Sequence, residues 1–326
     1  MNKIEKFRQF AQNRPGFDIK IESDKLIYSG LFEDDRYSIP AWFEIANSGD
    51  NYLFFLLSPR QVDEEIKSEI YNLCNSVNRS LNGCKCFLGP TNGLLNGIAC
   101  YVSEEHAYQP EWFFNAGRLL AFSCIDTFIN LRIGNGEPIS YKILNSGPSK
   151  AKILEDYIES NRNQWVFDGQ WRKTATADAE MQLMIFGRIA EVHTTMGEFQ
   201  LTYTIFVDDS VFSRLLYSLF QLPADVDLSK VLRHLNTLNA KYRNQKFFVA
   251  RNTIFMNIAY LSPSEYFDPE LLHDAFQSLL FQDFYEIIES ILASITTIPS
   301  AGITHQITLL KSDKGDLLDT VIKNRS

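Results

Sequence analysis

The sequence repeats itself at an offset of 161 residues, and this repeat limits the possible folds more than any other feature. Asn-Ser-Val-Asn at 75–78 and Asn-Thr-Leu-Asn at 236–239 are each followed, seven residues after the second Asn, by Lys-x-Phe and an aliphatic residue. Two further blocks align in the same order: 96–101 with 256–261, and Pro110-Glu111 with Pro269-Glu270. Chance rarely aligns three blocks in one order, so we expect two copies of one folding unit.

The aligned blocks predict a helix, two strands and a helix in each copy. Apolar residues recur at steps of three and four in both first helices, which is typical of a helix with one buried side. Asn92-Gly93 and Arg251-Asn252 predict the turns between the strands. Pro110 and Pro269 suit the first turn of a helix, where a missing N–H costs nothing. The predicted elements are helices at 62–81 and 228–242, strands at 84–88, 94–102, 245–249 and 254–261, and last helices from 110 and 269.

Sequence rich in strands precedes each block. The predicted elements are a helix at 3–13 and strands at 17–22, 26–32, 39–46 and 51–57 in the first copy, then a helix at 152–160 and strands near 164–172, 181–192 and 198–207 in the second. Residues 210–220 predict an extra helix that the first copy lacks. The fold class is therefore α+β, with two tandem copies of a helix–antiparallel sheet–helix–two strands–helix domain.

The domain boundaries follow the repeat. We expect a first domain at 1–135, a linker at 136–151 where Gly and Pro punctuate polar sequence, and a second domain at 152–296. The polar residues 297–326 predict a C-terminal tail, whose end at 311–326 we expect to be mobile or to form a short docking helix. A chain of 326 residues is also long for one compact core, which agrees with two domains.

The net charge of −9 argues against a nucleic-acid platform or docking on anionic lipid, because both need a basic surface. Charge would favour a basic partner, although solubility alone explains an acidic surface equally well. No apolar run reaches the roughly 18 residues that cross a bilayer, and the N-terminal residues lack the features of a secretory signal. Five cysteines are an odd number for a disulfide framework. These features predict a cytoplasmic protein.

No catalytic constellation is recognisable, so we expect a protein that is not an enzyme, with no catalytic residue, cofactor or metal. The five histidines are scattered, and Gly134-Asn135-Gly136 is followed by a Pro that a phosphate loop would not tolerate. Cys84 and Cys86 share a face of a predicted strand and could form a thiolate group with Cys74. Their spacing matches no usual zinc motif, and small core residues are the simpler interpretation.

Two sets of residues are candidates for binding. Trp42, Phe43, Phe54 and Phe55 lie on adjacent predicted strands and cannot all face one layer of helices. Their surplus could be buried inside the molecule or a dimer, where two copies pack sheet against sheet, or it could line a groove for an apolar helix or strand of another protein. Asn78 and Asn239, the paired Asn of the repeat, could bond the helix end or the neighbouring strand, or could contact a ligand.

The pattern resembles the type III secretion chaperone-like fold, and within it the YbjN-like family. The resemblance lies in the Asn-rich end of the middle helix, the following strand pair and the Pro-Glu opening of an apolar last helix. It implies non-enzymatic α+β domains, often paired, whose relatives bind helical or extended protein segments. The expected function is a protein-binding module, chaperone-like or regulatory, in a homodimer or a covalent pseudo-dimer. The alternative is a small-ligand sensor with a pocket between the two copies.

Overall fold

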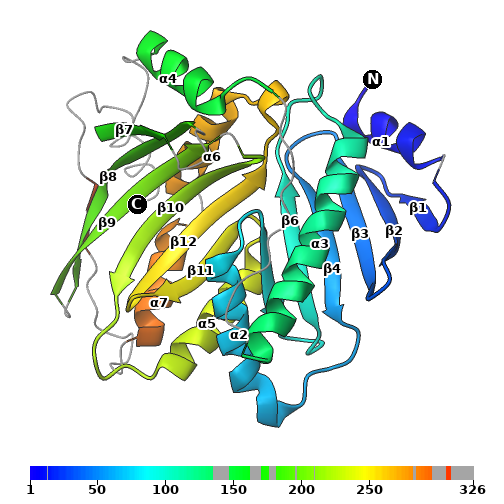
Figure 1. The fold of residues 1–326 in the computed structure, drawn as a ribbon. Helices are drawn as coiled ribbons and strands as arrows, with labels where there is room; N and C mark the ends of the chain where they lie inside the picture. Colours follow the sequence, from blue (N-terminus) through cyan, green and yellow to red (C-terminus); the bar gives the residue numbers. More distant parts are fainter. Residues whose placement is uncertain are drawn as a thin grey trace.

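The protein is a mixed α+β structure, seen in a computed structural model (Figure 1). The structure describes residues 1–12, 14–134, 147–161, 170–175, 181–194, 197–208, 210–281, 284–295 and 306–309. These residues form seven α-helices and one connected sheet. In the described ranges, none of the helices has the length and apolar character that spanning a membrane requires.

The order of elements is the same in the two halves of the chain, except that the first half ends in one long helix and the second in two shorter helices. The first half contains α1 (Lys3–Ala11), β1 (Phe17–Ile21), β2 (Lys25–Glu33), β3 (Ser38–Ala46), β4 (Asn51–Ser58), α2 (Lys67–Ser80), β5 (Cys84–Leu88), β6 (Leu95–Tyr101) and α3 (Pro110–Arg132). The second contains α4 (Lys150–Ser160), β7 (Gln170–Ala175), β8 (Met181–Thr194), β9 (Gly197–Asp208), β10 (Phe212–Gln221), α5 (Leu228–Lys241), β11 (Gln245–Ala250), β12 (Thr253–Leu261), α6 (Pro269–Phe281) and α7 (Phe284–Ile295). A last strand, β13 (Gln306–Leu309), follows.

Most predicted elements are confirmed, but residues 210–220 are a strand and not a helix. The apolar residues at 215, 216, 219 and 220 imitate helical spacing. In the structure β10 pairs with β9 on one side and β12 on the other, and Leu215, Tyr217 and Leu219 face the core at a period of two. Pairing on both sides therefore overrides the local pattern. Residues 212–221 therefore add no helix to the second half, and β10 follows β9 as β4 follows β3.

The predicted C-terminal tail, linker and strand at 164–172 are described only in part. Within the predicted tail, residues 306–309 form β13, which pairs antiparallel with β8, and the end of the tail at 311–326 lies outside the described residues. Most of the predicted linker, residues 136–146, and the first part of the predicted strand at 164–172 lie outside the described residues.

The structure aligns β6 with β12 in a register one residue away from the one that the repeat in the sequence predicts. Cys86 pairs with Gly97 and Phe247 pairs with Met256, so Gly97 corresponds to Met256, whereas the sequence aligned Asn96 with Met256. The short shared pattern Ile-Ala at 98–99 and 258–259 caused the error. It matters because a shift of one residue moves a side chain to the other face of the sheet.

The two halves meet edge to edge in one sheet. Its main strand order is β1-β2-β3-β4-β6-β12-β10-β9-β8-β13, and β5, β7 and β11 pair with β6, β8 and β12. The halves join where β6 and β12 run parallel, at Tyr101 and Leu261. The alternative in which two sheets pack face to face is therefore wrong. Figure 1 shows α3 on the near side of β4 and β6, and α6 and α7 on the far side of β10 and β12.

Each half has its own core, and the cores exchange residues at the junction. In the first half Phe43 packs edge-on against Phe113 of α3, with ring centroids 5.1 Å apart. In the second half Phe276 of α6 packs against Tyr203, at 5.1 Å. Cys100 of β6 belongs to the second core, and Leu261 of β12 belongs to the first. The halves are thus cross-packed as well as joined by strands.

Candidate functional site: an aromatic sheet face and the junction

The four predicted aromatic residues divide between the two faces of the sheet. Phe43 and Phe55 are fully buried on the face that α1 and α3 cover. Trp42 and Phe54 point the other way, are half-buried, and stack with ring centroids 5.2 Å apart and an angle of 7° between the rings. Successive side chains of a strand alternate between faces, so each adjacent pair had to split. Only Trp42 and Phe54 remain available to a partner.

Trp42 and Phe54 lie within an apolar surface on three neighbouring strands, which we call the Trp42 face. Ser29 of β2 pairs with Trp42 of β3, which pairs with Phe54 of β4, so these positions share a face. Leu31 pairs with Pro40 on the same face and is 48% exposed. The half-buried or exposed apolar members are Ile27, Leu31, Pro40, Trp42, Phe54 and Leu56. On β4 the Phe55 side is buried in the core of the first half, whereas Tyr52, Phe54 and Leu56 on the opposite side are half-buried.

The second half borders the Trp42 face through Arg243, in the turn after α5. Its guanidinium lies 5.2 Å from the ring centroids of both Tyr52 and Phe54, and its Nη1 is 2.8 Å from Glu44 Oε2. A cation above aromatic rings is attracted by their electron-rich faces. Arg243 therefore holds the aromatic side chains in place from across the junction.

Asn244 continues this contact beneath the surface. The Tyr52 hydroxyl donates to Asn244 Oδ1 at 2.6 Å, and the Asn244 amide donates to Asp50. Burial raises the pKa of Asp50, while the hydrogen bonds from Asn244 and Tyr52 act in the opposite direction. Burial also raises the pKa of Tyr52 far above its ordinary value, so this hydroxyl remains a donor. The cluster fixes Tyr52 at the edge of the Trp42 face.

The predicted Asn78 and Asn239 are buried and bond the backbone of their own half. Asn78 Oδ1 accepts from Cys86 N at 2.8 Å, and its amide donates to Cys86 O at 2.9 Å. Asn239 makes the same two bonds to Phe247, at 2.8 and 2.9 Å. Each side-chain amide therefore satisfies one backbone N–H and one backbone C=O of β5 or β11, as a neighbouring strand would. This geometry agrees with the structural alternative, not with ligand contact.

The other two Asn of the repeated motif cross the junction, which the sequence did not predict. Asn75 accepts from Val249 N at 2.7 Å and donates to Val249 O at 3.2 Å. Asn236 accepts from Leu88 N and donates to Leu88 O, both at 2.8 Å. Under the 161-residue offset Asn75 corresponds to Asn236 and Leu88 to Val249, so the two pairs are reciprocal. The repeated spacing was the signal; its target became visible only in three dimensions.

Lys85 and Lys246, also in the repeated motif, cross the junction in the same reciprocal way. Lys85 Nζ donates to the carbonyls of Tyr242 and Gln245, and Lys246 Nζ donates to those of Leu81 and Cys84. Leu81 and Tyr242 are the C-terminal caps of α2 and α5, where a positive charge is favourable. Burial lowers the pKa of both ammonium groups, that of Lys246 to about 8.

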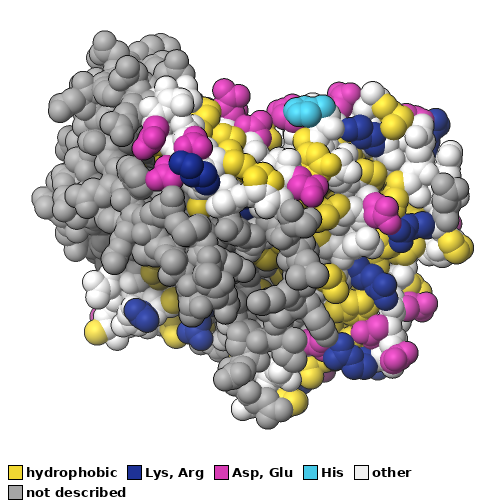
Figure 2. Space-filling model, turned by 45° about the horizontal axis from the view of Figure 1, so that its top comes forward, with side chains coloured by type: hydrophobic (Ala, Val, Ile, Leu, Met, Phe, Trp, Pro, Cys, Tyr) yellow, Lys and Arg dark blue, Asp and Glu magenta, His cyan; other side chains and the backbone are white. Residues whose placement is uncertain are grey.

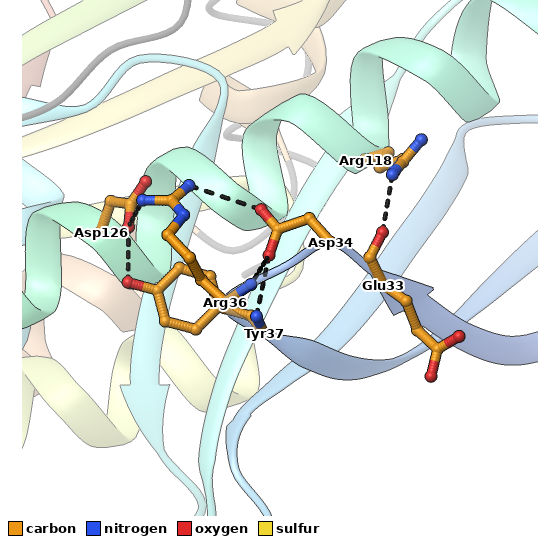
Figure 3. A network of polar contacts seen from close by, with 6 residues as sticks. All are labelled: Glu33, Asp34, Arg36, Tyr37, Arg118 and Asp126. Atoms are coloured by element: carbon orange, nitrogen blue, oxygen red, sulfur yellow. Dashed lines mark hydrogen bonds and ion pairs between the residues drawn. The ribbon is translucent and has the colours of Figure 1, made fainter.

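A polar network fastens the β2–β3 turn to α3 (Figure 3). Asp126, whose side chain is 3% exposed, accepts from the Tyr37 hydroxyl at 2.7 Å and pairs with Arg36 Nη1 at 3.0 Å. Asp34 Oδ1 accepts from the backbone N–H groups of Arg36 and Tyr37, both at 2.8 Å. The hydrogen bond to Asp126 raises the pKa of Tyr37 to about 12. The buried carboxylate is satisfied by its neighbours, which is the arrangement of a structural anchor.

The cysteines are core residues. All five are buried free thiols, which confirms the interpretation of Cys84 and Cys86 as small core side chains. A hydrogen bond with Cys124, together with burial, raises the pKa of Cys84, so the thiol stays protonated. Within the described ranges, no group of three or more His, Cys, Asp or Glu is placed to hold a metal ion.

Two small clefts lie at the junction. One is lined by the four motif Asn together with Tyr71, Leu232 and neighbours, and the other lies between Lys85 and Lys246. Each has about 10 Å³ of water-sized space, enough for about one water molecule. Ligand pockets usually enclose about 300–1,000 Å³, so a small-ligand sensor would need a larger opening than these two provide.

Together the fold and this site define a mixed α+β protein with a reciprocally bonded junction and an aromatic sheet face that α1 and α3 leave free. Comparisons of the chain with protein-family models, with curated proteins and with solved structures find no match.

Proposed function

We propose that the chain is a non-enzymatic protein-binding module, chaperone-like or regulatory, and that the Trp42 face is its binding surface. The observation that carries the proposal is the stacked Trp42–Phe54 pair, half-buried on a face that α1 and α3 leave free. Aromatic side chains are enriched at the centres of protein interfaces, because they bury a large area at a small entropic cost.

The proposal includes the finer architecture: two tandem copies of a domain with the type III secretion chaperone-like fold, similar to the YbjN-like family, joined as a covalent pseudo-dimer. It is supported by the common order of elements and by the reciprocal Asn and Lys contacts. Contacts in which residue i of one unit meets residue j of the other, and j meets i, are typical of a two-fold interface.

The chemistry of the face indicates the kind of partner. Its apolar members lie side by side on three neighbouring strands, which suits an apolar helix or an extended strand. The net charge of −9 favours a partner with basic residues beside that apolar segment.

Among the side chains that Figure 2 colours by type, acidic and basic ones are interspersed with hydrophobic ones, without a broad basic field of the kind that nucleic acid requires. We place the protein in the cytoplasm.

The test compares affinity capture by three forms of the full chain: wild type, Trp42→Ala with Phe54→Ala, and Leu216→Ala. Leu216 is half-buried on β10, paired with Thr204 as Phe54 is paired with Trp42, and serves as the matched control. We expect a partner that the wild type and the control retain and that the double variant loses. A photocrosslinking residue at position 56 should label that same partner. Equal retention by all three forms would contradict the proposal.

A further inference from the structure

The junction buries two lysine side chains that have no counterion among the described residues, and burial lowers the pKa of both. Lys85 and Lys246 are 3% and 4% exposed. The other cations that act on them are each other, Arg243 beside Lys85 and Arg214 beside Lys246. In the described part of the chain, neither lysine pairs with a carboxylate. Buried charges are normally paired, because leaving water without a counterion is costly.

The hydrogen-bonding capacity of both ammonium groups is also incomplete. An ammonium has three N–H donors, and each lysine gives two of them to carbonyls of the opposite half. One donor is left on each Nζ. Both lysines line the same cleft, together with Arg243, Asn244, Gly83 and Cys100. Lys85, Lys246 and Arg243 thus border one small space without any acidic side chain in its lining.

We propose that this cleft binds a monovalent, monatomic anion of the chloride class between Lys85 and Lys246. The cleft has about 10 Å³ of water-sized space, which suits one such ion and is too small for phosphate, sulfate or a carboxylate ligand. A water molecule could accept the same two hydrogen bonds, but only an anion also compensates the buried charge. Because the lysines come from opposite halves, the ion stabilises the junction between them.

The experiment uses the full chain and halide ions as probes. Thermal unfolding is followed at constant ionic strength while chloride replaces gluconate, which is too large for the cleft. Since a ligand that binds only the folded protein stabilises it by mass action, we expect a saturable rise in Tm of roughly a few degrees. Crystals grown or soaked in bromide should show an anomalous peak within hydrogen-bond distance of both Nζ atoms.

Two substitutions separate the site from general salt effects. Lys246→Met should abolish both the chloride-dependent rise and the bromide peak, whereas Lys230→Met, which removes the same charge from an exposed position on α5, should retain them. If Lys246→Met does not fold, the wild-type measurements decide alone. Equal Tm in chloride and gluconate, or a cleft without a bromide peak, would overturn the proposal.

Discussion

Replacement of Asn236 by Ala should destabilise the protein more than almost any other change at a polar residue. The Asn236 amide makes two hydrogen bonds to the backbone of Leu88, and both residues are buried. Each bond contributes about 1 kcal/mol net, and a buried backbone group left without a partner costs about 1–3 kcal/mol. We therefore expect a loss of about 2–4 kcal/mol in the free energy of unfolding.

Urea denaturation of the full chain, followed by far-UV circular dichroism, measures this loss. Asn72→Ala is the matched control, because Asn72 is exposed and its amide bonds only Ser68 O within α2. It should change stability by less than about 0.5 kcal/mol. Asn75→Ala should resemble Asn236→Ala, since it removes the reciprocal pair with Val249. If Asn236→Ala were as mild as Asn72→Ala, the reasoning that these amides hold the halves together would be wrong.

Three further predictions concern single positions. Phe43→Ala should lower the free energy of unfolding, measured by urea denaturation, by about 3–5 kcal/mol. Trp42→Ala should lower it clearly less, because Trp42 is half-buried on the opposite face. Equal losses would refute the assignment of faces. Gly97→Ala should cost about 1–3 kcal/mol, because a Cβ at Gly97 would lie 2.1 Å from the Phe55 ring, and an unchanged Tm would show that the ring can move aside. Burial lowers the pKa of Lys246 to about 8, below its ordinary 10.5, so the unfolded chain binds more protons between these pH values. In gluconate the wild type should therefore gain stability relative to Lys246→Met as pH rises from about 8 to 10.5; a constant difference in Tm would argue against a lowered pKa.

Local patterns predicted nearly every element of this fold. The turn that the sequence predicts at Arg251-Asn252 is found between β11 and β12, with φ of 47° and 59° at these two residues. The failure at β10 has a physical cause: two apolar pairs spaced four residues apart satisfy a helical period, and only the strands on either side decide between the alternatives. Long-range pairing of this kind leaves no mark in a window of ten residues.

The candidate site was predictable only in part, for a similar reason. The sequence indicated that Trp42, Phe43, Phe54 and Phe55 could not share a face, but it could not say which pair the helices would cover. It also singled out Asn78 and Asn239, whereas the residues that cross the junction are their neighbours Asn75 and Asn236. A repeated motif indicates that its residues have a structural role. Which residues they contact is determined by the packing of the two halves.

The comparison between halves separates the structural residues from those of the proposed binding surface. Asn75, Asn78 and Lys85 have equivalents that make the same contacts, as expected if the proposed duplication kept the junction. The Trp42 face has no such equivalent. In the first half Phe43 pairs with Leu53, which in turn pairs with Ala99. In the second half Ile205 pairs with Leu215, which in turn pairs with Ile258, so these three residues are the equivalents of the first three. The neighbouring residues Thr204 and Leu216 therefore occupy the positions that Trp42 and Phe54 occupy in the first half. An aromatic stack on one half alone is not needed to build the common fold. Binding to the Trp42 face should therefore involve one partner segment per chain, and a stoichiometry of two would be evidence for a second surface on β9 and β10.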